Sequence, residues 1–210
     1  MQGLIGKKVG MTQIFSKETG KVIPITVIHV GNNVVCQVKT AAHDGYSAVQ
    51  LSYDTCSEKN VTKPVIGHFK KCNAPVARVI KEFKPDNADE QFVSGQAVSL
   101  DVFDAIKFVD VVGISKGRGF AGGIKRHNFK RGRETHGCKA HRQRGSLGAN
   151  TTPGRVVPGL RMEGHYGAAQ VTARKLELIA VDKEAGLVMV KGAVPGPNRG
   201  VVYIKKNLTK

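Results

Sequence analysis

The sequence lacks a long hydrophobic run. No window approaches the roughly 18–20 uninterrupted apolar residues that a membrane-spanning helix needs, and the first eight residues contain no apolar core of a signal peptide. These absences argue against a membrane protein and against an exported one. We therefore expect a cytoplasmic protein without a membrane partner.

Cysteines are few and widely spaced. The four of them, Cys36, Cys56, Cys72 and Cys138, form no Cys-x-x-Cys pair. This spacing argues against a zinc knuckle and against a disulfide framework, and it favours reduced thiols in a cytosolic setting.

Acidic residues are scarce in the middle of the chain. The whole sequence has 33 Lys or Arg and 16 Asp or Glu, a net charge of +17. Residues 113–175 carry 14 of these bases with two acids, whereas residues 1–112 carry 13 bases with 11 acids. A solvated surface normally mixes both signs, so the central excess favours a polyanionic partner.

Apolar residues are scarce in the same region. Residues 125–161 contain ten Lys or Arg, one acid and six glycines. The side chains that could anchor a core are Phe129, Leu147, Val156, Val157 and Leu160. Their burial cannot offset an ordering cost of about 1–2 kcal/mol per residue, so we expect this segment to become ordered only against structured nucleic acid. Fully extended, its tip could stand up to roughly 60 Å from its ends.

The flanking sequence has the period-two alternation of strands, with turn residues between the runs. Strands are predicted over 12–15, 22–30, 34–38, 48–53, 77–83, 108–114, 171–181, 187–190 and 201–204, with turns at 18–20 and 182–186. A loop and then a strand are expected over 91–102, and a short helix over 62–72. Within 171–181, Leu176, Leu178 and Ala180 should share one face.

These patterns predict a mainly β protein: an antiparallel β-barrel or sandwich with little helix. The body would comprise residues 1–112 and 162–210, with a small insertion around 55–95. Residues 113–161 would form an extended basic arm inserted between strands.

A glycine-rich turn, Gly117-x-Gly119-x-x-Gly122, matches the pattern of dinucleotide sites and follows a predicted strand. Such a site must open an amphipathic helix and needs an acid about 20 residues later, where this chain has bases between Lys139 and Arg144. A nucleotide-binding enzyme is therefore the weaker alternative. The glycines better suit close backbone approach to phosphates.

Three metal-ligand types cluster at His136, Cys138 and His141. The surrounding cations would repel a metal ion and no fourth ligand is nearby, so no metal is expected. Ser146 or Cys138 could pair with His136 as a nucleophile, but no orienting carboxylate accompanies them. We expect no catalytic residue and no cofactor. Contact of the imidazoles with nucleotides, or plain exposure to solvent, is favoured.

The longest uncharged stretch of the basic segment, residues 145–154, lies between Arg144 and Arg155. Small residues permit close backbone approach, and Ser, Thr and Asn offer hydrogen bonds to bases or 2′-hydroxyls. The stretch is interpreted as the tip of the arm. A polar turn without a partner is the alternative.

Several sequence islands occur together along the whole chain. They are GKKVGMT at 6–12, VGISKGRGF at 112–120, KRHNF at 125–129, THG at 135–137, GS at 145–146, PGR at 153–155, MEGHYG at 162–167 and VKGAVPG at 190–196. In this order they resemble the bacterial form of the ribosomal protein L3 family. The resemblance implies a translation-protein type of β-barrel, a structural role in the large ribosomal subunit and in its early assembly, and an arm that reaches through ribosomal RNA (rRNA) toward the peptidyl transferase centre. The partners it implies are large-subunit rRNA and neighbouring ribosomal proteins, with no small-molecule substrate.

Carried over to this chain, the resemblance implies two sets of residues. The rRNA-binding set is Lys116, Arg118, Lys125, Arg126, Lys130, Arg131, Arg133, His136, Lys139, Arg142, Arg144, Arg155 and Arg161. The tip near the peptidyl transferase centre is Gly145, Ser146, Leu147, Gly148, Ala149, Asn150, Thr151, Thr152 and Pro153. Some members carry a methylated glutamine where this chain has Ala149, so that modification should be absent here. Nonspecific packaging of DNA remains a further alternative to rRNA binding.

Overall fold

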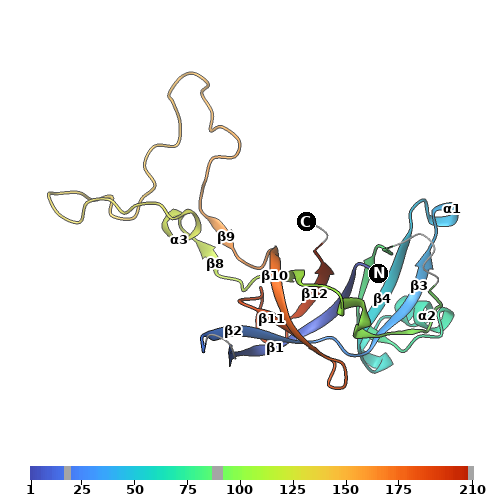
Figure 1. Ribbon diagram of the computed structural model, residues 1–210. Coiled ribbons are helices and arrows are strands. Elements are labelled where there is room, and N and C mark those ends of the chain that lie inside the picture. Colours follow the sequence, from blue (N-terminus) through green and yellow to red (C-terminus); the bar gives the residue numbers. More distant parts are fainter. Residues whose placement is uncertain (17–19, 87–91, 208–210) are drawn as a thin grey trace. The chain divides into compact units, whose positions relative to one another are not determined.

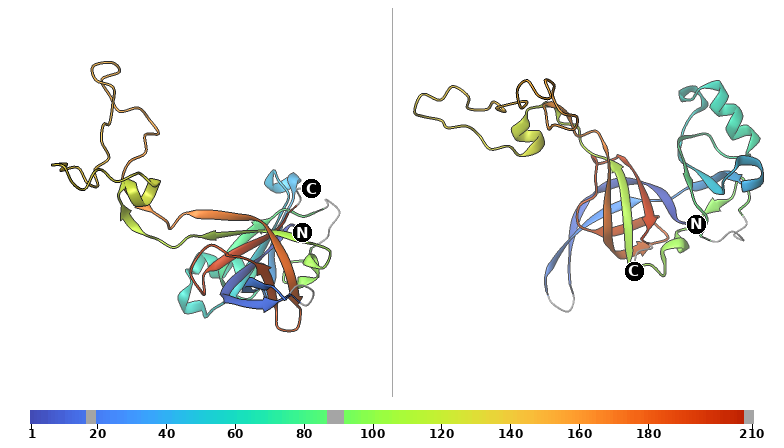
Figure 2. Two further views of the ribbon diagram at one scale, coloured as in Figure 1. Left: turned by 60° about the vertical axis from the view of Figure 1, so that its left-hand side comes forward. Right: turned by 90° about the horizontal axis from the view of Figure 1, so that it is seen from above.

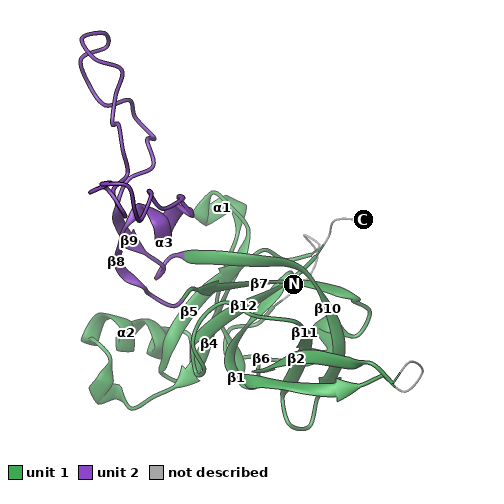
Figure 3. Ribbon diagram, turned by 90° about the vertical axis from the view of Figure 1, so that its left-hand side faces the viewer, with its two compact units in different colours: residues 1–115, 170–210 green, residues 116–169 purple. Residues whose placement is uncertain are grey.

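The computed structural model describes residues 1–16, 20–86 and 92–207. The chain divides into two compact units. Unit 1 contains residues 1–115 and 170–210, and unit 2 contains residues 116–169, coloured green and purple in Figure 3.

Unit 1 contains a closed barrel of six strands, labelled in Figure 1, in the order β1-β12-β7-β10-β11-β2. Every neighbouring pair is antiparallel. The strands are β1 (Gly3–Phe15), β2 (Val22–His29), β7 (Phe108–Ile114), β10 (Gln170–Asp182), β11 (Leu187–Lys191) and β12 (Val201–Lys206). The predicted antiparallel barrel is confirmed, and its first strand begins nine residues before the predicted one.

A second sheet, β5-β4-β3-β6, is built from the chain between β2 and β7. Its strands are β3 (Asn33–Lys39), β4 (Ala48–Thr55), β5 (Ala77–Phe83) and β6 (Ala97–Val98). The helices of this region are α1 (Ala41–Asp44), η1 (Glu58–Asn60), α2 (Lys63–Lys71) and η2 (Leu100–Phe103). The sheet therefore takes in more of the chain than the insertion suggested around 55–95. The predicted helix at 62–72 is confirmed. Pro64 is tolerated there because it lies in the first turn of the helix, where the missing N–H would have no partner within the helix.

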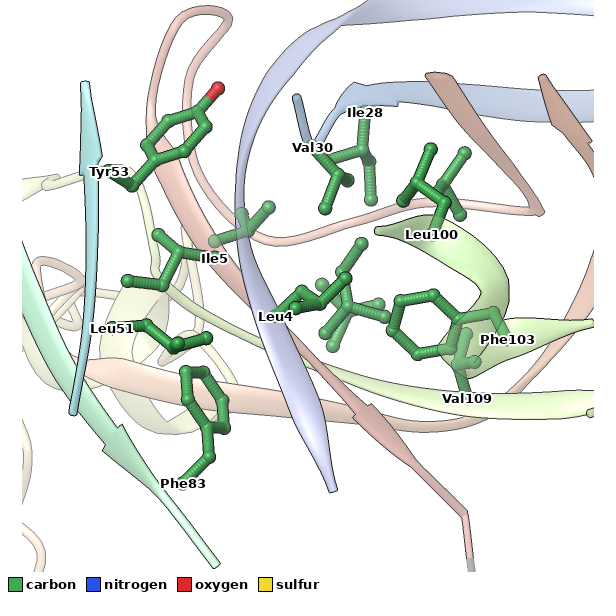
Figure 4. Close-up of a cluster of buried hydrophobic side chains, with 14 of the residues drawn as sticks. Leu4, Ile5, Ile28, Val30, Leu51, Tyr53, Phe83, Leu100, Phe103 and Val109 are labelled. Carbon is green, nitrogen blue, oxygen red and sulfur yellow. The ribbon is translucent and has the colours of Figure 1, made fainter. Parts of the chain in front are cut away.

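Strand β1 contributes to one continuous core that serves both the barrel and the second sheet. Successive side chains of a strand point to opposite faces, so Leu4 and Ile5 enter different parts of that core. Figure 4 shows Leu4 beside Phe103 and Val109, and Ile5 on the side of Leu51. All five side chains are fully buried.

Asn33 is a buried polar residue that joins β1 to the start of β3. Its side-chain oxygen accepts a hydrogen bond from the Ile5 N–H at 3.1 Å, and its amide nitrogen donates to the Ile5 and Val30 carbonyls at 2.9 and 2.7 Å. The side chain thus satisfies three backbone groups that are removed from water.

We expect Asn33→Ala to lower the free energy of unfolding by about 2–3 kcal/mol, because buried backbone groups would lose their partners. Urea unfolding followed by circular dichroism measures this change. Gln37→Ala on the same strand, a residue whose side chain is half-buried, is the matched control. Equal destabilisation by the two variants would contradict the role of the Asn33 hydrogen bonds.

The prediction of which β10 side chains face the core is wrong near the C-terminal end of the strand. Leu176 and Leu178 pack against the core as expected, but Ala180 is exposed and Val181 takes its place. The register with β11 shifts between Leu178 and Ala180. A bulge adds one residue to one strand, so every side chain beyond it changes face.

The strand expected within 91–102 is also wrong in most of its length. Of residues 92–102, the described part of this range, only Ala97 and Val98 are in a strand, and Leu100–Phe103 form the helical turn η2, which buries Leu100 and Phe103. The predicted turn at 182–186 connects β10 to β11 as expected. Most of the predicted turn at 18–20 lies outside the described residues.

Unit 2 has little regular structure. Two short antiparallel strands, β8 (Gly119–Ala121) and β9 (Gly164–Tyr166), pair with each other, and one short helix, α3 (Gly123–His127), follows β8. The chain between α3 and β9 runs as long loops, which Figure 2 shows in two further views. Among the described residues no helix is long and apolar enough to cross a membrane.

Candidate nucleic-acid interface

Unit 2 has almost no interior. Of its residues, all of which the structure describes, only Ala121 and Gly123 are buried. The five side chains that the sequence offered as anchors for a core are half-buried in the case of Phe129 and exposed in the other four. Burial of apolar surface therefore contributes little to the stability of this unit.

The charge of unit 2 is strongly one-sided. It contains twelve Lys or Arg and two acids, Glu134 and Glu163, for a net charge of +10. The twelve bases are all members of the predicted rRNA-binding set. Ten are exposed, while Arg126 and Arg144 are half-buried, and the thirteenth member, His136, is exposed.

These cations have almost no protein partners of opposite charge. Within the described residues a single ion pair involves unit 2, between Arg131 and Glu134 at 2.6 Å, and both side chains are more than half exposed. A cluster of uncompensated cations raises the local positive potential and attracts phosphate groups.

Arg126 differs from the other predicted contacts because the protein itself uses it. Its Nη1 donates to the Met162 carbonyl at 2.8 Å, and the His127 Nε2–H donates to the same oxygen at 2.9 Å. Two side chains of α3 thereby hold the chain just before β9. Gly164 also fits here because a Cβ at this position would lie 2.6 Å from Arg126 Nη1. Arg126 retains the rest of its guanidinium group for other acceptors.

Helix α3 ends at a turn in which the residues after the helix contact Gly123, the first residue of the helix. Asn128 adopts the left-handed conformation, with φ of 58° and ψ of 38°, and its N–H donates to the Gly123 carbonyl. The Phe129 ring then covers Gly123, where an added Cβ would lie 2.7 Å from the ring. This arrangement fixes the direction in which the chain leaves the helix toward the loops.

The loop around His136 is closed by backbone contacts. The Gly132 N–H donates to the His141 carbonyl at 3.0 Å, and the His141 Nδ1–H donates to the Arg133 carbonyl at 2.8 Å. These two hydrogen bonds connect residues 132–133 to His141. In the described part of the chain no group of three His, Cys, Asp or Glu side chains is placed to hold a metal.

The guanidinium group of Arg144 has a buried nitrogen, Nη1, that lacks a hydrogen-bond acceptor among the described residues. The side chain lines an open pocket of about 590 Å³ together with Gln143, Gly145, Leu147, Met162 and Glu163. A buried guanidinium nitrogen without an acceptor is costly, and a phosphate or base oxygen entering this pocket would satisfy it.

Every residue of the predicted tip, 145–153, is exposed. Within it the Ser146 hydroxyl donates to the carbonyl of Gly148, two residues away, at 3.0 Å. The segment therefore presents backbone and small polar groups to the surroundings, which suits contact with an irregular RNA surface.

The glycine-rich turn differs in one detail from the sequence expectation. A helix does begin directly after Gly122, which the sequence reasoning did not predict. This helix has only five residues, and the preceding strand β8 pairs with β9 alone. A dinucleotide fold requires a parallel βαβ unit, so the arrangement does not support that alternative.

Two parts of this arrangement have no signal in the sequence. The shared acceptor of Arg126 and His127 is a backbone carbonyl about 35 residues away, and a carbonyl carries no side-chain identity. The β8–β9 pairing joins three-residue strands, too short for a detectable alternation.

Comparison with known proteins agrees with the islands found in the sequence. The sequence pattern of the family described as Ribosomal protein L3 matches residues 77–186. A protein of Picosynechococcus called large ribosomal subunit protein uL3 is 53% identical over 92% of this chain and 91% of its own length. Proteins of the same name from Alkaliphilus metalliredigens and Heliobacterium modesticaldum are 51% and 49% identical over 98% and 99% of this chain, and over 97% of their own lengths. With this identity along nearly its full length, the chain belongs to the ribosomal protein L3 family.

Proposed function

We propose that this protein is a structural constituent of the large ribosomal subunit in the cytoplasm, and that it binds large-subunit rRNA through unit 2. The observation that carries the proposal is the set of twelve cations in unit 2, of which ten are exposed and one is paired with an acid. The names of the relatives support the assignment to the large subunit.

In this proposal, unit 2 neutralises phosphates where segments of rRNA converge. The exposed Lys and Arg side chains would release counterions from the RNA, which supplies affinity without sequence preference. Arg144 would donate a hydrogen bond to a phosphate or base oxygen that enters its pocket, and the exposed residues 145–153 would approach the peptidyl transferase centre. Holding RNA segments together in this way would assist early assembly of the subunit, where neighbouring ribosomal proteins would also contact the chain.

The proposed role is structural and not enzymatic. Among the described residues, neither possible nucleophile is hydrogen-bonded to a histidine or a carboxylate: the Ser146 hydroxyl donates to the Gly148 carbonyl, and Cys138 is a free cysteine. The family description and the names of the relatives point to the same conclusion.

The test is the salt dependence of binding to a large-subunit rRNA fragment. If about 6–10 phosphates are contacted, the affinity of the unmodified protein should fall by about 10³–10⁵ between roughly 50 and 200 mM salt. Replacing Arg131, Arg133, Lys139 and Arg142 together by Gln should make the slope of log affinity against log salt shallower by roughly three.

The matched control removes the same charge from unit 1. Lys59, Lys63, Lys70 and Lys71 are exposed lysines of η1 and α2. Changing all four to Gln should leave the slope close to that of the unmodified protein. An equal change in slope for both sets would show that any cation serves, and equal affinity for duplex DNA and rRNA would favour the packaging alternative.

A further inference from the structure

The short ribbon β8–β9 presents an aromatic pair. Phe120 lies directly opposite His165 in the antiparallel register. Their rings are nearly perpendicular, with an interplanar angle of 85° and centroids 6.0 Å apart. The two side chains therefore lie on one face of the ribbon, because cross-strand partners project to the same side.

Phe120 is the most exposed large apolar side chain among the described residues. It leaves 70% of its surface uncovered, and His165 is exposed as well. A ring with most of its surface in water contributes little burial energy to the fold, and its uncovered face is available to a partner.

The backbone beneath this pair is well defined. The Arg118 N–H donates to the Tyr166 carbonyl at 2.8 Å, which extends the pairing of the two strands. Gly167 follows with φ of +75°, and a Cβ at this position would lie only 2.1 Å from the Lys116 carbonyl oxygen. The two strands are thus joined at this end by a close backbone contact that only glycine permits. This contact restricts the backbone next to Phe120.

The charges beside the ring indicate which partner it suits. Lys116 and Arg118 precede Phe120, and both are exposed and without an ion pair among the described residues. The single acid nearby, Glu163, lies at the other end of the ribbon near Gly122. Exposed aromatic rings next to cations are the combination with which proteins bind single-stranded RNA, because the ring stacks on a base while the cations hold the backbone.

We propose that Phe120, supported at its edge by His165, is a stacking platform for an unpaired base of rRNA. This inference rests on the proposed function, since it names a contact within the same RNA complex. Stacking accepts any base, so the site would select unpaired nucleotides by shape rather than by sequence. Neither residue is among the cations and tip residues expected to contact RNA.

The test uses the full-length chain and an rRNA fragment. Phe120→Leu keeps an apolar side chain and removes the flat ring, so the affinity should fall by about 5- to 150-fold. The salt slope should remain unchanged, because no charge is lost. Phe15→Leu is the matched control, since Phe15 is 66% exposed in unit 1, and it should leave the affinity unaltered.

A second variant provides a direct signal. The sequence contains no tryptophan, so Phe120→Trp introduces a single indole at the platform. Its affinity should stay close to that of the unmodified protein, and its fluorescence should be quenched when the rRNA fragment binds. Trp placed at position 15 in the same way should show no quenching.

The inference and the proposed function fail in different ways. Salt-dependent rRNA binding with full affinity in Phe120→Leu and no quenching in Phe120→Trp would overturn the stacking platform and leave the proposed function standing. Absence of salt-dependent binding in the unmodified protein would instead overturn the proposed function.

Discussion

Replacing residues 116–168 by the dipeptide Asn-Gly is expected to leave unit 1 folded and to reduce the affinity for an rRNA fragment by about 10³-fold or more. The design follows the strand register. Ile114 of β7 and Gln170 of β10 are direct antiparallel partners. Two residues therefore suffice to connect the strands, and Asn-Gly is the preferred sequence for such a turn.

The physical reason for the expected result is the unequal distribution of core and charge. The continuous hydrophobic core belongs to unit 1, whereas unit 2 buries only Ala121 and Gly123. The deletion removes twelve bases and two acids. Stability should therefore change little, and phosphate contacts should be lost together.

Two measurements check this prediction: thermal unfolding by circular dichroism and rRNA binding at a fixed salt concentration. The isolated peptide of residues 116–169 is the complementary control, and it should bind rRNA with a strong salt dependence while showing no cooperative melting. Loss of cooperative melting in the shortened protein would show that the barrel depends on unit 2, which our account excludes.

Phe103→Ala is expected to lower the free energy of unfolding by about 3–5 kcal/mol. Phe103 is fully buried and lies against Leu4 and Val109 in the core (Figure 4). Removing its ring loses the transfer free energy of the side chain and leaves a cavity that the surrounding strands cannot fill completely. For a protein of this size the melting temperature should fall by about 6–20 °C.

Phe15→Ala is the control for this variant because Phe15 exposes 66% of its surface. A surface substitution of this kind usually changes stability by about 0.5 kcal/mol or less. Chemical denaturation with both variants gives the comparison. A cost for Phe103→Ala that is no larger than the cost for Phe15→Ala would show that η2 does not anchor the core.

The barrel could be predicted from the sequence because its strands keep a simple alternation. The segments 22–30, 108–114 and 201–204 read as strands and form β2, β7 and β12 within one or two residues. In these strands the burial of side chains alternates with the same period of two as the backbone, so the order of apolar and polar residues is enough to predict them.

The errors in unit 1 arise where this period is interrupted. The bulge between Leu178 and Ala180 exchanges the two faces of β10, and a bulge depends on the partner strand, which the local sequence does not reveal. Leu100 was assigned to a strand, yet a helical turn buries both Leu100 and its neighbour Phe103. In so short an apolar segment, periodicity does not distinguish a helical turn from a strand, because both can bury the apolar side chains.

In unit 2 the composition of the candidate interface could be predicted from the residues, but its internal structure could not. The cations could be named because the excess of one charge is visible in the residues themselves. The support of α3 could not, because Arg126 and His127 reach a backbone carbonyl far along the chain. Phe120, the proposed stacking platform, could not be singled out because the sequence does not reveal how exposed a single aromatic residue is.

The central claim is that the loops of unit 2 obtain their order from RNA and not from packing within the protein. Hydrogen exchange of the backbone amides in residues 128–163 tests this most directly, with the free chain compared to the chain bound to large-subunit rRNA. We predict fast exchange in the free chain, because these loops contain neither helix nor strand, and strong protection in the complex, with β1 and β12 protected in both. Slow exchange of residues 128–163 in the free chain would contradict the claim.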